Sequence, residues 1–205
     1  DLLDLSRLES SGWVARLELL SVQEVAKEAW SWCADTASSR DITIQFAAGL
    51  QVMADRQGLS QSLRNLLENA VRHSDEGGVV RVRARQVGEC GHIEVLDEGE
   101  GIPPKSLSRI FERFYRADSS RARDFGGTGL GLAIVRHLIE GMGGRVEAES
   151  VLGTGAASAG ASGKVSITTG NAFAAAGESG PLERRRRGLA ADAAASSAMR
   201  AASSA

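Results

Sequence analysis

The chain has 205 residues, of which 42% are hydrophobic and 24% charged, and its formal net charge is −2. These values describe a globular protein with its own core, and they exclude a strong overall attraction to nucleic acid or to a membrane surface. Two cysteines are too few for a disulfide framework and their spacing fits no metal site, so we expect a cytoplasmic location. No apolar run is long enough to span a membrane and no signal peptide opens the chain.

The first twelve residues carry a leucine at every third position, namely Leu2, Leu5 and Leu8, before Gly12. This spacing is typical of the last turns of an amphipathic helix. The simpler alternative is a short helix that belongs to the domain that follows.

Residues 14–97 alternate between short strands and two longer helices. Ser21 stands three residues before Glu24, a capping box that predicts a helix running to Cys33. Apolar residues at helical spacing predict a second helix from Leu59 to Val71. The strands predicted by period-two alternation or by short apolar runs are 14–20, 42–46, 52–54, 79–87 and 93–96.

The pattern continues with a helix over 128–139, ended by glycines, and a strand over 145–150. Together these elements predict an α/β protein: a two-layer α/β sandwich in which three main helices cover one face of a single mixed sheet.

Beyond Gly155 the composition shifts to Ala, Ser and Gly. Such a segment buries too little apolar surface to offset its ordering entropy, so we predict a low-complexity, mostly disordered tail over 156–205. Within it, 164–169 is compatible with one short strand. The basic run 184–187 is interpreted as solvated, and no nucleic-acid contact is expected.

Two asparagines on the second long helix are the first candidate binding residues. Asn65 and Asn69 are four residues apart and share a helix face. A carboxamide oxygen is a hard ligand suited to Mg²⁺, which also binds through substrate phosphates. Arg72 lies one turn further and is placed to contact phosphate. Taken alone, these residues are more simply interpreted as the solvated side of an amphipathic helix.

The second candidate is a carboxylate at the end of a predicted strand. Asp97 precedes Gly99 and Gly101, and it is placed to accept a hydrogen bond from an adenine amino group. The glycines would let the backbone approach the base closely. An ordinary strand-to-loop turn is the alternative.

A glycine-rich run before the predicted helix over 128–139 is the third candidate. Backbone N–H groups at a helix start bind phosphate oxygens. The glycine spacing and the polar residues before the run argue against a dinucleotide-binding motif. A flexible hinge is compatible with the same residues. The run consists of Gly127, Thr128, Gly129, Leu130 and Gly131.

Four blocks, at 65–70, 97–101, 111–115 and 127–132, resemble in order and spacing the N, G1, F and G2 boxes of the catalytic ATP-binding domain of bacterial sensor histidine kinases. The resemblance covers roughly residues 1–155. It implies a Bergerat-type ATP-binding fold, with residues 1–12 as the end of the dimerisation helix. It also implies a catalytic domain over 13–155 with a lid at about 99–127.

The resemblance assigns roles to individual residues. It implies that Asp97 recognises adenine, that Asn69 is a Mg²⁺ ligand, and that Asn65 supports metal or phosphate. It implies that Arg116 meets the terminal phosphate, and that Phe111, Phe114 and Tyr115 anchor the lid. A helix packed on the core by these aromatic residues is the alternative. We therefore predict Asn65, Asn69 and Arg116 as the catalytic residues.

The implied function is transfer of the ATP γ-phosphate to a histidine of a dimerisation domain, in cis or in trans, for two-component signalling through a response regulator. The phosphoacceptor motif is not found around His73, His92 or His137. The parent kinase is expected in the cell membrane, with no membrane contact from this segment. In related ATPases a Glu often stands where Asn65 is found, and Asn65 suits phosphotransfer better than hydrolysis.

Two other functions remain open: a nucleotide-binding remnant without kinase activity, and a related superfamily ATPase or anti-sigma-type Ser kinase. The F box and the leucine-rich lead-in argue against the second. The first is favoured by a departure at the C-terminus, where the family's last strand usually carries Ser or Thr followed by alternating aromatic and aliphatic residues. Here residues 156–160 read Ala-Ala-Ser-Ala-Gly, which predicts a lost or replaced strand and an unpaired sheet edge.

Overall fold

The computed structural model describes residues 13–117, 128–151, 163–170 and 172–174. The chain divides into two units, 1–173 and 174–205, and the architecture below concerns the first. Residues 1–12, residues 118–127 of the predicted lid and most of the predicted tail lie outside the described residues.

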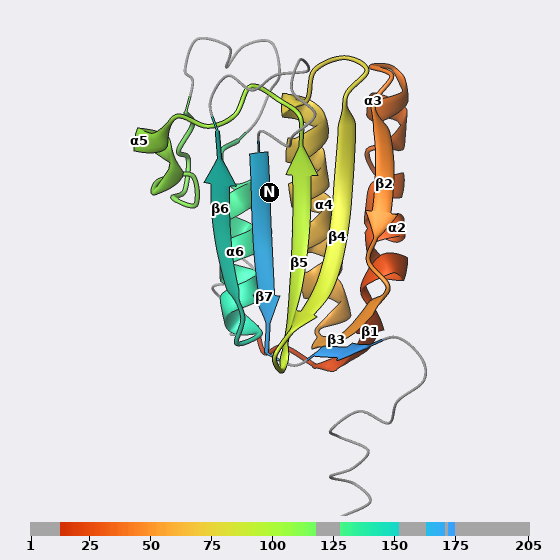
Figure 1. The fold of residues 1–205 in the computed structure, drawn as a ribbon. Helices are drawn as coiled ribbons and strands as arrows, with labels where there is room; N and C mark the ends of the chain where they lie inside the picture. The colour runs from red at the N-terminus through yellow and green to blue at the C-terminus, as the bar shows by residue number, and fades with distance from the viewer. Residues whose placement is uncertain (1–12, 118–127, 152–162, 171, 175–205) are drawn as a thin grey trace, which may run out of the picture. The chain divides into compact units, whose positions relative to one another are not determined.

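Two sheets organise the unit. The larger has five strands in the order β2-β4-β5-β7-β6, and the smaller has three in the order β1-β3-β8 (Figure 1). The strands are β1 Glu18–Ser21, β2 Thr43–Ala47, β3 Leu50–Ala54, β4 Val79–Val87, β5 Cys90–Asp97, β6 Arg145–Ser150, β7 Gly163–Thr169 and β8 Ala172–Ala174. The helices are α2 Val22–Ser31, α3 Ala34–Ser38, α4 Arg56–His73, α5 Pro104–Leu107 and α6 Gly131–Gly141.

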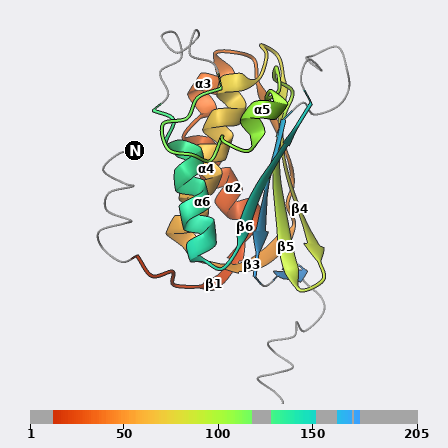
Figure 2. The ribbon, with the colours of Figure 1, turned by 90° about the vertical axis from the view of Figure 1, so that its left-hand side faces the viewer.

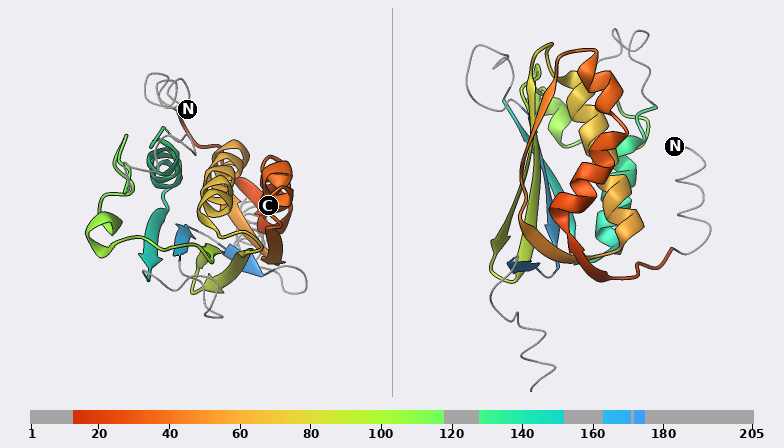
Figure 3. Two further views of the ribbon diagram at one scale, coloured as in Figure 1. Left: turned by 90° about the horizontal axis from the view of Figure 1, so that it is seen from above. Right: turned by 90° about the vertical axis from the view of Figure 1, so that its right-hand side faces the viewer.

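Three main helices, α2, α4 and α6, lie side by side on one face of the five-stranded sheet (Figures 2 and 3). The larger sheet is mixed, because β2 pairs with β4 in parallel whereas β4, β5, β7 and β6 pair antiparallel. The predicted two-layer α/β sandwich with three main helices is therefore confirmed. Among the described residues, the structure contains no helix with the length and apolar character of a membrane span.

The prediction of a single sheet is wrong. β1 and β3 pair antiparallel with each other and form a separate small sheet. The break follows β2, where the Leu50 N–H donates to the Ala48 carbonyl at 2.7 Å. This tight turn redirects the chain, so β3 leaves the plane of the larger sheet.

Asp55 starts α4 three residues earlier than predicted. Its Oδ1 accepts a hydrogen bond from the Gly58 N–H at 2.8 Å, as an N-cap residue does. Its Oδ2 accepts from the Arg16 N–H at 2.9 Å, which ties the N-terminal segment to the helix. The predicted capping box of α2 is present in one direction, since Ser21 Oγ accepts from the Glu24 N–H at 3.4 Å.

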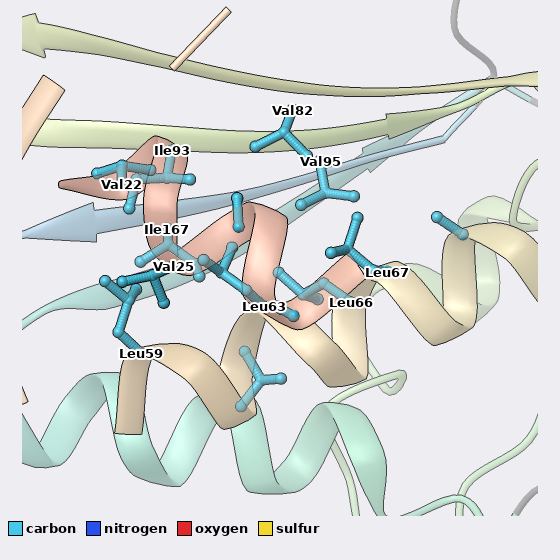
Figure 4. Packing of buried hydrophobic residues seen from close by; sticks show 14 of the residues in the cluster. Val22, Val25, Leu59, Leu63, Leu66, Leu67, Val82, Ile93, Val95 and Ile167 are labelled. Carbon is cyan, nitrogen blue, oxygen red and sulfur yellow. The ribbon is translucent and has the colours of Figure 1, made fainter. Parts of the chain in front are cut away.

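The hydrophobic core lies between the helices and the larger sheet (Figure 4). Helix side chains at spacings of three and four meet alternate side chains of the inner strands, as the two periodicities require. The labelled core residues are Val22, Val25, Leu59, Leu63, Leu66, Leu67, Val82, Ile93, Val95 and Ile167.

The position of the last strand of the larger sheet differs most from the prediction. β7 lies between β5 and β6 and pairs antiparallel with both (Figure 1). Ile167, near the centre of β7, is 0% exposed. The predicted domain boundary at Gly155 is therefore too early for this sheet, and the expected unpaired edge is not found beside β5. The short alternation of Val165 and Ile167 is enough to make an inner strand once both neighbours are present.

The predicted helix over 128–139 begins later, at Gly131, and runs to Gly141. Thr128, Gly129 and Leu130 consequently form the approach to α6. The predicted lid contains the short helix α5, followed by turns up to residue 117.

Candidate functional site

The two asparagines of α4 face the start of α6. Asn65 Nδ2 donates a hydrogen bond to the Gly131 carbonyl at 3.2 Å. A methyl group placed on Gly131 would lie 3.8 Å from Asn65 Cγ and 3.9 Å from Asn69 Nδ2. The structure thus brings Asn65, Asn69 and Gly131, which the sequence predicted separately, to one place.

The beginning of α6 has no side-chain cap. Its N-cap residue is Leu130, whose side chain cannot accept from the first N–H groups of the helix. Leu130 is instead buried, and it packs with Ile134 and Leu138 in a cluster that Trp13 joins. Thr128 is exposed, and Gly127 lies outside the described residues.

Asp97 ends β5, and its carboxylate is held close to the backbone. Its Oδ1 accepts from the Gly99 N–H at 3.0 Å. Burial raises the pKa of Asp97, while the Gly99 hydrogen bond and His73 act in the opposite direction. Gly99 is packed against the His73 carbonyl so closely that a side chain there would overlap it. The end of α4 and the turn after β5 are therefore joined backbone to backbone.

Charged groups gather around His73 at the end of α4. The residue is exposed, yet the surrounding protein desolvates its ring enough to lower its pKa, and Arg72 adds to the effect. Asp97 and Glu100 raise the pKa of His73, and Arg116 lowers it. Because all four charges act on one ring, the predicted site residues Arg72, Asp97 and Arg116 lie at the same end of α4.

The F-box residues divide between the core and the surface. Phe111 is 8% exposed and belongs to the main core, whereas Phe114 is 63% exposed. The Phe114 N–H donates to the Gly129 carbonyl at 2.9 Å, which joins the F box to the glycine-rich run. Gly129 has a φ of +70°, and a side chain there would come within 2.9 Å of the Phe114 backbone. Tyr115 lies under the Arg109 guanidinium, 4.4 Å from its ring centre.

The residues present fit a magnesium ion held together with a phosphate. Within the described ranges, no group of three or more His, Cys, Asp or Glu is arranged to hold a metal. A metal here would rely on the neutral oxygen of Asn69 and on ligand phosphate oxygens, which is how Mg²⁺ commonly binds. Asn69 lies beside the start of α6, with its Nδ2 3.9 Å from a methyl group placed on Gly131.

Gly163 is the residue of the site region that sequence reasoning missed. It pairs with Asp97 across the β5–β7 ladder, although the sequence placed it in the tail. The only sequence signal was the alternation of Val165 and Ile167 just after it. Gly101, with a φ of +77°, lies beyond Gly99 in the turn as predicted.

Comparison with known proteins agrees with this arrangement. Residues 54–167, more than half of the chain, match the family described as histidine kinase-, DNA gyrase B-, and HSP90-like ATPase. The chain is 37% identical over 157 residues to the sensor-like histidine kinase SenX3 of Mycobacterium tuberculosis, covering 76% of this chain and 38% of that one.

Solved structures give the same result. The mycobacterial sensor histidine kinase MprB superposes with a TM-score of 0.63 at 29% identity, over 75% of this chain and 97% of that one. Full-length ShkA in complex with AMPPNP superposes with a TM-score of 0.69 at 28% identity, over 85% of this chain and 35% of that one. The chain therefore belongs to the histidine kinase-, DNA gyrase B-, and HSP90-like ATPase family, as an ATP-binding catalytic domain of the sensor histidine kinase type. It spans 38% of the length of SenX3, so the similarity concerns one part of a longer kinase.

Proposed function

We propose that this domain binds ATP with Mg²⁺ beside α4, α6 and Asp97, and transfers the γ-phosphate to a histidine of a dimerisation domain. The phosphohistidine would then supply a response regulator in two-component signalling. We further propose that the parent kinase lies in the cell membrane and that this domain works on its cytoplasmic side.

The observation that carries the proposal is the hydrogen bond from Asn65 Nδ2 to the Gly131 carbonyl, 3.2 Å long. It joins the helix that carries the candidate metal ligand to the helix start that suits phosphate. The polar face of α4 is therefore not turned only to solvent, because it packs against the N-terminus of α6.

Each end of the nucleotide has its own partners in this proposal. Asp97, as an ionised carboxylate, accepts from the adenine amino group, while Gly99 and Gly101 let the backbone approach the base. At the other end, the backbone of Gly129 to Gly131 donates to phosphate oxygens. Residues 127–131 as a whole remain the predicted phosphate run.

The phosphate side also needs positive charge. A Mg²⁺ ion on Asn69 would supply it directly to the phosphates, with Asn65 supporting the same region. Arg72 and Arg116 are the further candidates for contact with the phosphates; both act on His73 at the end of α4, on the side of the site that also carries Asp97. Holding and neutralising the γ-phosphate is the main contribution a phosphotransfer domain makes.

Asn65 favours transfer over hydrolysis. Its carboxamide nitrogen donates to Gly131, and an amide has no basic group with which to activate water. The nucleophile would be the imidazole of the incoming dimerisation domain, which needs no base on α4.

The proposal is tested by mixing the chain with Mg-ATP and a dimerisation fragment of a similar sensor kinase, and assaying acid-labile phosphate on the fragment. We expect labelling of the fragment and none of the isolated chain. Asn69→Ala should abolish labelling, whereas Gln57→Ala, which removes an exposed amide from the first turn of α4, should not. Labelling that survives Asn69→Ala, or stable phosphate on the chain alone, would contradict the proposal.

A further inference from the structure

The last turn of α4 is held from outside the helix by one arginine. Arg40 lies between α3 and β2, and its guanidinium reaches the end of α4. Its Nη1 donates to the carbonyls of Val71 at 2.5 Å and Arg72 at 3.2 Å, and its Nη2 donates to the Ser74 carbonyl at 2.6 Å. One side chain therefore binds three main-chain carbonyls at the same helix end.

These are carbonyls that the helix cannot satisfy by itself. The last helical hydrogen bond runs from the Ser74 N–H to the Ala70 carbonyl at 2.9 Å, so the carbonyls of residues 71–74 lie beyond it. The arginine binds three of these four. The fourth belongs to His73, and it is the carbonyl against which Gly99 packs. The end of α4 is thus shared between the arginine and the turn after β5.

The backbone around Arg40 adds a second attachment at the same place. The Arg40 carbonyl accepts from the Gly77 N–H at 2.9 Å, and the Thr43 N–H at the start of β2 donates to the Gly78 carbonyl at 3.1 Å. The segment between α3 and β2 is therefore joined both to α4 and to the loop that follows it. A guanidinium on such a segment gives the helix end a defined position, because its planar fork donates in set directions.

We propose that Arg40 is a positioning residue for the base site. By holding three carbonyls of the last turn, it fixes where the His73 carbonyl meets Gly99, and so where the turn after β5 presents the Asp97 carboxylate. Gly99 is the link, because its N–H donates to Asp97 Oδ1 at 3.0 Å. The proposal rests on the proposed role of Asp97 in adenine binding.

The charge of the guanidinium suits this position. A cation at the C-terminal end of a helix is favourable, because the helix dipole places partial negative charge there. Hydrogen bonds from a charged donor are also roughly twice as strong as those between neutral groups. Loss of Arg40 should therefore loosen the last turn. The first consequence in the site should appear at Gly99 rather than at Asn69, which lies inside the hydrogen-bonded part of the helix.

Two arginine substitutions at opposite ends of α4 test the proposal. Arg40→Ala removes the cap, whereas Arg56→Ala removes an arginine from the first residue of the helix, about 25 Å away along its axis. The Arg56 side chain is 55% exposed and pairs with Glu18 at 3.4 Å and Glu28 at 3.8 Å. Because the loss of any helix cap lowers the melting temperature, adenosine binding is measured by calorimetry well below it, in the folded state.

We expect Arg40→Ala to weaken adenosine binding about fivefold, the size of one ordinary hydrogen bond, and Arg56→Ala to leave it unchanged. We also expect the Gly99 amide to exchange its hydrogen faster in Arg40→Ala, by a larger factor than the Ile93 amide near the centre of β5. A cap with a structural role alone would leave adenosine affinity unchanged and would speed the exchange of both amides equally.

Wild-type adenosine affinity in Arg40→Ala, with affinity lost in Asp97→Asn, would overturn the positioning role alone. Equal losses in Arg40→Ala and Arg56→Ala would overturn it as well. Wild-type affinity in Asp97→Asn would instead remove the adenine role itself, and the positioning role with it.

If Arg40→Ala does not fold, Arg40→Lys takes its place in the same measurement. One ammonium group cannot hold the Val71 and Ser74 carbonyls in the way that the two guanidinium nitrogens do, so we expect adenosine affinity to fall about threefold. Wild-type affinity in Arg40→Lys would then overturn the proposal.

Discussion

The two sides of the candidate site are built in different ways. On the helix side, the polar groups are side-chain amides of α4, Asn65 and Asn69, which are partly exposed and lean towards the start of α6. On the strand side, one carboxylate is held by the backbone N–H of Gly99, at the end of the ladder of β5 and β7.

This difference indicates which substitutions should change ligand binding and which should change the stability of the fold. An amide on the open face of a helix can be removed without disturbing the core, so its loss should change binding only. The strand side continues directly into the core, because Ile93 on β5 and Ile167 on β7 are cross-strand partners and are both fully buried. Substitutions along β5 and β7 should therefore divide sharply between those that unfold the domain and those that alter the site.

The largest expected effect is on stability. Ile167→Ala removes a side chain that is 0% exposed, and we expect it to lower the free energy of unfolding by about 2–5 kcal/mol. Thr168→Ala is the matched control on the same strand, because Thr168 is only partly buried and makes one long contact, 3.4 Å to His92 Nε2. Urea unfolding measures both. Equal losses in the two variants would mean that β7 is not a core strand.

The strands of the larger sheet show what local sequence is able to predict. β4 and β6 have the predicted bounds, because regular alternation or an apolar run is closed by glycine turns. β7 was predicted only as a possibility, since its few apolar residues stand among Ala, Ser and Gly. Its inner position depends on pairing with β5, some seventy residues earlier, and no local pattern encodes that contact.

The candidate site shows the same difference between what local sequence predicts and what tertiary packing adds. The motif around Asn65, Asn69 and Asp97 is local and was recognised in the sequence. The approach of Gly99 to the His73 carbonyl, and the pairing of Gly163 with Asp97, come from tertiary packing. Such contacts become visible only in three dimensions.

The next largest effect concerns the metal on the helix side. Asn69→Ala removes the proposed Mg²⁺ ligand while leaving Asp97 and β7 untouched. We expect Mg-ATP affinity to fall about tenfold and adenosine affinity to stay within about twofold of the wild type. Calorimetry with both ligands, with Gln57→Ala as the exposed amide control, measures the split. If both affinities fell equally, Asn69 would be a structural residue and the two sides of the site would not be independent.

The smallest expected effect is a pH dependence confined to the strand side. Because burial raises the pKa of Asp97, this carboxyl takes up a proton at higher pH than an ordinary aspartate, whose pKa is about 3.9. Only the ionised form is a pure acceptor for the adenine amino group, so adenosine affinity should be constant above the raised pKa and decline as the pH falls through it. Adenosine is the ligand of choice because its lack of phosphates removes their own titration.

The stability of the fold should depend on pH in the opposite direction to adenosine affinity. A carboxyl whose pKa is higher in the folded than in the unfolded state favours folding fully at pH values below its unfolded pKa, and this contribution is lost as the pH rises through the folded pKa. Asp97→Asn, a neutral side chain of the same shape, should therefore bind adenosine weakly at every pH without lowering the melting temperature at neutral pH. Asp35→Asn, an exposed carboxylate on α3, serves as the control for loss of charge. If Asp97→Asn melted well below both Asp35→Asn and the wild type at neutral pH, the ionised carboxylate would be a structural anchor of the strand side, and the separation of binding from stability would fail at the residue where it is expected to be clearest.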